Sequence, residues 1–377
     1  MKTKVLYLVS GINTPSGWGT EFIQNLIFKL SQKNIEATIL SPIYIHTDSN
    51  ISSWVKQIEK DYGVRIITID APKFIKKILI LHLLLTPMIT TISAIKLLSK
   101  EKFDLIHEFS SIPFILIRSL IFKTFFKTKT VFSLAVLNKS ILGSKIWFKV
   151  FDFASLYLIP STKLLTDLEN FGINPKKLIY SPPGIDLTKF NSRLSKKDSR
   201  EKLNLPLDKF IVSYYGTLTK EKGIETIIKS SKILEKEKDI IFVIFSIWRG
   251  EKNINSYKNQ LKRKNILLFQ RYIDITLLLN ASDVVIFPQL SGYGTTIPPI
   301  SVIEATVSKT PVIATDIVGN DEVLPKGSLI KANNENLLSE KILDIYNNKQ
   351  VLEESKIQKF DIEKSVRLHL DLYEKIK

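Results

Sequence analysis

The stretch FIVSYYGTLTKEKGIETII, residues 210–228, decides the fold of this chain. It begins with a β-branched and aromatic run, passes through Gly216, Lys220, Lys222 and Gly223, and continues with apolar residues at helical spacing. A short apolar run of this kind is typical of a strand buried on both faces, and the residues after the second glycine predict a helix. The stretch therefore predicts a strand, a glycine loop and a helix, which is the repeating unit of a parallel α/β sheet.

Outward from this stretch, the same alternation of short apolar runs and helical segments extends through the whole chain. Such alternation predicts parallel, doubly wound sheets, whose ligands bind beyond the carboxyl ends of the strands. The charged segment 191–209 has no long apolar run, so we expect it to connect two domains. The expected strands are 5–10, 37–41, 64–70, 104–109, 130–137 and 177–183 in the first half, and 210–216, 239–246, 265–270, 283–288 and 311–316 in the second.

The composition is that of a folded protein with two domains. The chain has 377 residues, of which 44% are hydrophobic and 24% are charged, and this length exceeds one ordinary core. It contains no cysteine, which excludes a disulfide framework, thiolate zinc sites and a cysteine nucleophile, and which fits a reducing cytosol. The first apolar run ends at Ser10 without a small-residue cleavage site, so we interpret it as a buried strand and not as a secretion signal.

Positive charge and apolar residues coincide in the first half of the chain. The net charge is +17, and residues 51–150 hold 16 basic against 6 acidic residues. The same window contains the most apolar run, Ile78–Ile95, and a second apolar and basic run over 114–127. At an anionic membrane, the burial of apolar side chains and the attraction of lysines to lipid phosphates both contribute to binding. We therefore expect residues 73–129 to associate with a membrane surface. The alternatives are a helix buried on the sheet and a membrane-spanning helix, which Pro87 and several polar residues disfavour.

The first expected strand leads into a glycine-rich loop. Gly11, Gly17 and Gly19 precede a helix that we expect to begin near Thr20. Glycines let a ligand approach the backbone closely, and the free amides at a helix start attract anions. The spacing is not Gly-x-Gly-x-x-Gly, so it does not predict a dinucleotide site. From the residues alone, the loop is either a tight turn or a ligand loop.

The second half repeats this arrangement at two places. Lys222 follows the strand 210–216, where a lysine and backbone amides can neutralise a diphosphate leaving group, although loop lysines are usually just solvated. Glu304 lies in an apolar helix whose first turn we expect to contain Pro298 and Pro299. A carboxylate in such a helix is costly to bury unless it accepts hydrogen bonds. Sugar hydroxyls and a neighbouring lysine are equally suitable donors.

Together these segments resemble the retaining nucleotide-sugar glycosyltransferases of the GT-B fold, and within them family 4, the "group 1" family. The resemblance covers nearly the whole chain and is strongest in its second half. It implies an α/β protein in which two Rossmann-like parallel-sheet domains face each other across a cleft. It rests on five segments in the family's order, SGWGTEF (16–22), FDLIHE (103–108), PPGIDLTKF (182–190), GTLTKEKGIETII (216–228) and IEATVSKTPVIATDIVGNDEV (303–323).

The resemblance also implies a role for each matched part of the chain. Residues 1–190 would bind the acceptor, residues 191–360 would bind the nucleotide sugar, and a helix over 361–377 would pack back on the first domain. Lys222 would contact the donor diphosphate, Glu304 the nucleotide ribose, and His107 the reaction centre; the alternative for His107 is a core histidine at a strand end. The other residues implied at the site are Gly216, Thr217, Thr296 and Ile297 for the donor, and Gly17, Trp18 and Gly19 for the acceptor and phosphate.

Two positions depart from the family pattern. The family usually has two glutamates with seven residues between them, and the first of these positions is Thr296 here. The arginine that usually accompanies the conserved lysine corresponds to Thr217. Both departures bear on the identity of the sugar and on catalytic competence. A lapsed family member that acts as a binding subunit and a nucleotide-sugar epimerase of the same fold are therefore alternatives, and Thr296 counts against the epimerase.

The function that the resemblance implies is a retaining transfer of a hexose from a UDP- or GDP-linked donor to a hydroxyl acceptor, without a cofactor or an obligatory metal. The sequence shows no metal-ligand spacing. From the basic, apolar region 73–129 we expect the acceptor to be lipid-linked or embedded in a membrane. We expect the protein to be cytoplasmic and to reach this acceptor at the inner face of the membrane. We do not expect nucleic acid as a partner, because the positive charge is mixed with long aliphatic runs instead of stacking aromatic residues.

Overall fold

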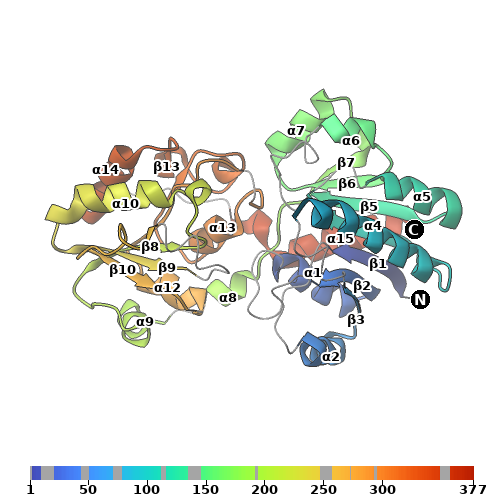
Figure 1. Cartoon of the computed structure of the whole chain (residues 1–377), viewed down its shortest axis with the longest axis horizontal. Helices are drawn as coiled ribbons and strands as arrows, with labels where there is room; N and C mark the ends of the chain where they lie inside the picture. The colour runs from blue at the N-terminus through green and yellow to red at the C-terminus, as the bar shows by residue number, and fades with distance from the viewer. Residues whose placement is uncertain are drawn as a thin grey trace. The chain divides into compact units, whose positions relative to one another are not determined.

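The computed structural model divides the chain into two compact units (Figure 1). The first unit consists of Met1–Gly184, Tyr293–Thr296 and Ile362–Lys377, and the second of Ile185–Gly292 and Ile297–Asp361. The structure describes all residues except 1, 10–20, 44–50, 71–78, 112–115, 135–145, 192–193, 247–256, 272, 293–294 and 349–356.

The passage between the units lies at Gly184 and not after residue 190, where the sequence places it. The reason is local. The Ile185 amide donates to the Phe360 carbonyl at 2.8 Å, and Ile185 forms a parallel β-bridge with Asp361. The side chains of Ile185 and Phe190 are buried in the core of the second unit. The segment 185–190 therefore belongs to the second unit.

The first unit contains a seven-stranded sheet in the order β3-β2-β1-β4-β5-β6-β7, with parallel pairing throughout. The strand order reverses between β1 and β4, which is the switch point of a doubly wound sheet. Its strands are β1 (Thr3–Val9), β2 (Ile35–Ile43), β3 (Arg65–Asp70), β4 (Leu105–Ser110), β5 (Lys129–Leu134), β6 (Leu156–Ile159) and β7 (Leu178–Tyr180). The short strand β6 is missing from the expected set.

Helices cover both faces of this sheet. One face packs against α1 (Glu21–Ser31), α2 (Ile51–Tyr62) and α15 (Ile362–Ile376), and the other against α4 (Leu79–Leu98) and α5 (Ile117–Phe126). Adjacent residues of β1 point to opposite faces of the sheet, since Tyr7 lies on the α15 side and Leu8 on the α4 side. The short helix α6 (Ile146–Val150) packs its Phe148 ring on Phe132 of β5, 5.8 Å away, and α7 (Thr162–Asn170) follows β6.

The second unit repeats the plan with six parallel strands in the order β10-β9-β8-β11-β12-β13. Its strands are β8 (Phe210–Tyr215), β9 (Ile240–Phe245), β10 (Ile266–Phe269), β11 (Val284–Phe287), β12 (Val312–Thr315) and β13 (Leu329–Ile330). Its helices are α8 (Leu187–Asn191), α9 (Lys196–Leu203), α10 (Ile224–Ile233), α12 (Ile275–Ala281), α13 (Ile300–Val307) and α14 (Glu335–Tyr346). The switch point lies between β8 and β11. The prediction of two Rossmann-like parallel sheets is confirmed, and only the two-residue β13 was not expected here.

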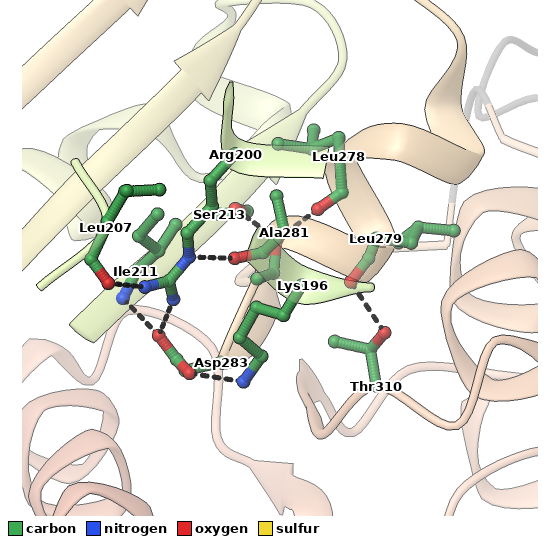
Figure 2. A network of polar contacts seen from close by, with 11 residues as sticks. Lys196, Arg200, Leu207, Ile211, Ser213, Leu278, Leu279, Ala281, Asp283 and Thr310 are labelled. Atoms are coloured by element: carbon green, nitrogen blue, oxygen red, sulfur yellow. Dashed lines mark hydrogen bonds and ion pairs between the residues drawn. The ribbon is translucent and has the colours of Figure 1, made fainter. Parts of the chain in front are cut away.

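A buried ion pair fastens the amino edge of the second sheet (Figure 2). Arg200 of α9 donates from Nη2 to Asp283 at 2.7 Å, and Asp283 also accepts from the Ile211 amide of β8 at 2.6 Å. The remaining Arg200 donors reach the carbonyls of Ala281 at 3.0 Å and Leu207 at 2.8 Å. Every charge in this network therefore has partners, which is the condition under which a buried ion pair is tolerated.

The apolar run of the first half forms α4, which has one buried and one exposed side. Among its described side chains, Ala94, Leu97 and Leu98 are buried against the sheet, whereas Met88 and Ile92 are exposed. No helix in the described part of the chain is both long enough and apolar enough to cross a bilayer. The structure therefore supports the expected alternative of a helix packed on the sheet, and this helix also presents apolar side chains outward. Association with a membrane surface stays a prediction.

Candidate donor-binding site

The glycine loop after β8 carries the lysine that the sequence singles out. Lys222 lies in a 3₁₀ turn, Lys220–Lys222, between the end of β8 and the start of α10. The turn is closed by Gly223, whose φ of 79° is a left-handed conformation. Because β8 borders the switch point of the sheet, this loop occupies the place where doubly wound sheets bind their ligands.

The structure joins this loop to the one that follows β11. A Cβ atom on Gly223 would lie 1.8 Å from the Pro288 carbonyl oxygen, so only glycine permits this approach. The Leu290 amide also donates to the Glu221 carbonyl at 2.9 Å. The two loops that flank the switch point are thus held to one another by backbone contacts, which fixes the position of Lys222 relative to the β11 side of the site.

Lys222 carries a charge that no carboxylate in the described part of the chain pairs with. Its side chain is half-buried, and the loss of hydration lowers the pKa of its ammonium below the ordinary value. No carboxylate among the described residues pairs with it, in contrast to Lys229 nearby in the chain, which pairs with Glu335 at 3.4 Å. A cation that is partly removed from water without a partner is an unfavourable arrangement that an anionic ligand would relieve.

Glu304 lies in the second turn of α13, on the other side of the switch point. The hydroxyl of Tyr215, the last residue of β8, lies 3.2 Å from Glu304 Oε2 and donates to the Ser301 carbonyl at 2.8 Å. Pro298 and Pro299 precede the helix instead of occupying its first turn, because α13 begins at Ile300. The carboxylate is therefore tied directly to the strand that leads into the Lys222 loop.

The remaining donor residues of the second sheet have clear but different environments. Gly216 directly follows β8 with a φ of 147°, and the carbonyl of Thr217 accepts from the Tyr214 hydroxyl at 2.7 Å. The Ile297 side chain is buried against Gly319 and so presents only its backbone to a ligand. Thr296 is buried and is assigned to the first unit, and its part in donor binding stays a prediction.

In the first unit, His107 is a fully buried residue in the middle of β4. The Tyr373 hydroxyl lies 2.5 Å from its Nδ1, and the Ser133 hydroxyl lies 2.7 Å from its Nε2. Burial lowers its pKa well below the usual histidine value, and the neighbouring His369 lowers it further. With both ring nitrogens engaged inside the core, this geometry favours the core-histidine alternative. A role of His107 at the reaction centre stays a prediction.

The other first-domain predictions divide in two. Gly17, Trp18 and Gly19 lie outside the described residues. Arg118, which the sequence places in the basic region 73–129, does not contribute to a basic surface, because it is buried and pairs with Glu108 of β4. Its Nε donates to Glu108 Oε2 at 2.8 Å. An acid in an otherwise apolar strand needs a buried partner, and that requirement was the available signal for this pair.

Sequence reasoning missed two residues of the candidate donor site. It treats Tyr215 only as a strand residue, although the Tyr215 hydroxyl contacts Glu304. Pro288 gives no signal of its own, and its contact with Gly223 follows only from the pairing of β8 with β11. A glycine at the end of a lysine turn is the single hint that another backbone approaches closely.

Comparison with known proteins agrees with this architecture. Residues 195–360 match the family model described as "Glycosyl transferases group 1". The crystal structure of Anabaena HepE in complex with UDP superposes with a TM-score of 0.74 at 15% identity, over 99% of this chain and 100% of that one. Sucrose-phosphate synthase from Thermosynechococcus elongatus superposes with a TM-score of 0.80 at 18% identity, over 99% of both chains.

A curated relative covers both units in part. The chain is 28% identical over 256 residues to the Escherichia coli UDP-Gal:alpha-D-GlcNAc-diphosphoundecaprenol alpha-1,3-galactosyltransferase, which is 63% of this chain and 64% of that protein. The match thus spans less than two thirds of the relative's length. Taken with the two parallel sheets and the glycine–lysine loop at the second switch point, these findings show that the chain has the GT-B fold and that its residues 195–360 are similar to the glycosyl transferases group 1 family.

Proposed function

We propose that this protein is a glycosyltransferase that moves a sugar from a nucleotide-diphosphate sugar to a hydroxyl acceptor, with retention of configuration and without a metal. The observation that carries the proposal is the position of Lys222, a half-buried cation that no carboxylate of the described residues pairs with, at the switch point of a segment that matches the group 1 model. UDP is the first nucleotide to test, because HepE was crystallised with UDP and the E. coli relative is named for UDP-Gal.

In the proposed reaction, the bond that breaks joins the sugar to the diphosphate. Negative charge develops on the departing phosphate oxygen, and the Lys222 ammonium and the loop amides act at that point. Glu304 accepts hydrogen bonds from the nucleotide ribose and so fixes the donor. The acceptor hydroxyl attacks from the face that the diphosphate leaves, which retains the configuration, and its proton passes to the leaving group.

The proposal is tested by binding first and turnover second. UDP-, GDP- and ADP-sugars are added to the protein in a thermal-shift screen, because a ligand at 100 times its Kd stabilises the native state by about 2.7 kcal/mol. Release of the nucleoside diphosphate then reports transfer to acceptor or water. A shift with one nucleotide series that is lost in both Lys222→Ala and Glu304→Ala supports the assigned roles.

Three results would contradict parts of the proposal. An unchanged shift in both variants would remove Lys222 and Glu304 from the site. Binding without turnover would favour the lapsed, binding-only alternative, for which Thr296 and Thr217 stand at positions of the expected glutamate and arginine. Conversion of the sugar without nucleotide release would favour the epimerase.

For the acceptor, we propose a lipid-linked sugar at the cytoplasmic face of a membrane. The E. coli relative is named for a diphosphoundecaprenol-linked acceptor. In this chain, α4, α5 and α6 pack on one face of the first sheet, and each presents apolar side chains to the outside. The exposed apolar residues on these helices are Met88, Ile92, Ile117, Leu120, Phe125, Ile146 and Val150, with Phe125 75% exposed. We call this set the outer apolar face.

Charge makes the outer apolar face suitable for an anionic bilayer. Lys96, Lys123 and Lys149 are exposed on the same three helices, and Lys127 is exposed directly after α5. A lysine close to an anionic bilayer contributes about 1 kcal/mol, and insertion of the apolar side chains adds to it. The region extends the expected segment 73–129 to α6, and it excludes Arg118 because that residue is buried.

Vesicle flotation tests the membrane proposal separately from catalysis. We expect the protein to float with phosphatidylglycerol-containing vesicles at low salt and much less with phosphatidylcholine vesicles or at high salt. Leu120→Ser/Phe125→Ser and Lys123→Glu/Lys127→Glu should each weaken flotation about ten-fold or more, given ~1 kcal/mol per lysine. The matched controls in the second unit, Ile233→Ser and Lys197→Glu, should have no effect. Equal recovery with neutral and anionic vesicles would remove the idea.

A further inference from the structure

The hydroxyl of Tyr215 occupies a place between two acceptors on α13. It donates to the Ser301 carbonyl at 2.8 Å, and Glu304 Oε2 lies 3.2 Å away. A phenol has one proton, so the hydrogen bond is shared between a carbonyl and a carboxylate that are one turn apart on the same helix. The contact spans the switch point, because Tyr215 ends β8 while α13 follows β11.

The rest of the Tyr215 side chain is held firmly. Tyr215 is 3% exposed, lies in the core of the second unit and packs its ring edge-on against Phe287 of β11, with 5.3 Å between the ring centroids. Burial, followed by the charge of Glu304, raises the pKa of the hydroxyl well above the ordinary tyrosine value. Tyr215 therefore stays protonated at physiological pH and remains a hydrogen-bond donor toward Glu304.

We infer that Tyr215 is a positioning residue for Glu304, which orients the carboxylate toward the ribose hydroxyls of the donor nucleotide. The inference rests on the proposed function, since it gives Glu304 a partner in the ligand. The Tyr215 hydroxyl is one of the contacts that orient the Glu304 carboxylate, and its loss leaves the side chain with more rotational freedom that ribose binding then has to remove. The loss should therefore appear in recognition of the ribose more than in the chemical step.

The chain provides a close control for this contact. The Tyr257 hydroxyl donates to Glu225 Oε1, also at 3.2 Å and also in the second unit. Glu225 belongs to the first turn of α10 and has no assigned part in donor binding. Tyr257→Phe thus removes a tyrosine–glutamate hydrogen bond of the same length, and it reports what such a loss does through stability alone.

The experiment measures Kd values of UDP and of 2′,3′-dideoxy-UDP, with the guanosine pair in parallel, for wild type, Tyr215→Phe, Glu304→Ala, the double variant and Tyr257→Phe. We expect wild type to prefer the hydroxyl-bearing nucleotide at least ten-fold. Tyr215→Phe should reduce this preference about five-fold while Tyr257→Phe leaves it within two-fold. In a double-mutant cycle, Tyr215→Phe should have no further effect once Glu304 is alanine.

The outcomes separate this inference from the proposed function. If Glu304→Ala reduces ribose preference but Tyr215→Phe does not, or if their effects add, Tyr215 has only a structural role and the inference fails alone. If Glu304→Ala leaves the preference intact, the donor role of Glu304 fails, and the role of Tyr215 fails with it. A kcat reduced more than the donor affinity in Tyr215→Phe would also overturn a positioning role.

Discussion

The two edges of the second sheet differ in whether a charge that is removed from water has a partner of opposite charge among the described residues. At the amino edge, the guanidinium of Arg200 donates to Asp283 and to two carbonyls, and Asp283 accepts from a strand amide as well (Figure 2). At the carboxyl edge, Lys222 is partly removed from water and no described carboxylate pairs with it. The same fold thus places a closed network at one edge and an open cation at the other.

This difference indicates what each edge contributes. A satisfied ion pair holds α9, α12 and two strands in place, and nothing is left over for a ligand. An unsatisfied lysine lowers the stability of the free protein slightly, and the free energy is recovered when an anion binds. We therefore expect variants that remove a charge at the amino edge to change stability without changing ligand affinity, and variants that remove the Lys222 charge at the carboxyl edge to do the reverse.

The largest effect should come from the amino edge. Asp283→Ala leaves the buried Arg200 guanidinium without its anion, and breaking such a pair costs about 3–5 kcal/mol. Lys196→Ala removes a contact of 2.6 Å to the same aspartate, but from a half-exposed side chain, and should cost about 1 kcal/mol or less. Urea unfolding of both variants measures the difference. An equal decrease in the free energy of unfolding of both variants would show that burial does not determine how much each ion pair stabilises the protein.

Gly223→Ala should have the next largest effect, and it connects the two kinds of edge. The residue needs a left-handed φ of 79°, and its Cβ would overlap the Pro288 carbonyl. Gly63→Ala is the control, because Gly63 has a φ of 64° with open space around its Cβ position. The conformational term alone is about 1–2 kcal/mol. A free energy of unfolding that falls clearly further in Gly223→Ala, together with weaker UDP binding, would show that the loop contact positions Lys222.

Lys222→Met should change ligand affinity with little change in stability. The methionine keeps the aliphatic length and removes the desolvated charge, so the free energy of unfolding should stay the same or rise slightly. Affinity for the nucleoside diphosphate should fall at least ten-fold, since a charge-assisted contact contributes about 1.5–3 kcal/mol. Lys229→Met on α10 is the control and should leave binding unchanged. A destabilised Lys222→Met with normal binding would reverse the comparison between the edges.

The smallest effect should be a proton linkage at alkaline pH. Burial lowers the pKa of Lys222 below 10.5, so between the two values the unfolded chain holds more protons, and this residue makes stability rise with pH there. A bound diphosphate raises the pKa again, so binding should take up a fraction of a proton and weaken as pH rises. Calorimetry in two buffers of different ionisation enthalpy measures the uptake. Lys222→Met should abolish it, and uptake that persists would assign the proton to another group.

Most of the fold could be predicted because buried strands are recognisable in the sequence as apolar runs between turn residues. The two missed strands lack this signal. The residues of β6, LYLI at 156–159, follow an aromatic segment without a glycine or proline break, and a short apolar run of that kind cannot be assigned by periodicity alone. The strand β13 has two residues, too few for any pattern.

The candidate site was predictable in part, because glycine loops and isolated charges are local features. Lys222 and Glu304 were found in this way, whereas Tyr215 required knowledge of which helix lies beside the end of β8. For His107, a local feature of the sequence suggested a role in the reaction, but its contacts in the fold could not be predicted. A histidine near a strand end suggests chemistry, but its contacts with Tyr373 and Ser133 come from α15 and β5, which are distant in sequence.

The packing of α15 has a consequence for the way the chain is made. His369 and Tyr373 cover one side of β1 and β4, and the Lys377 ammonium lies 3.4 Å from the Thr3 hydroxyl of β1. On the ribosome, the first 184 residues therefore emerge with α1 and α2 available for this face, but the part that α15 covers stays exposed until the whole second unit has been synthesised. The domain that is translated first thus completes its core last, and in the interval the exposed part of its sheet is a substrate for chaperones.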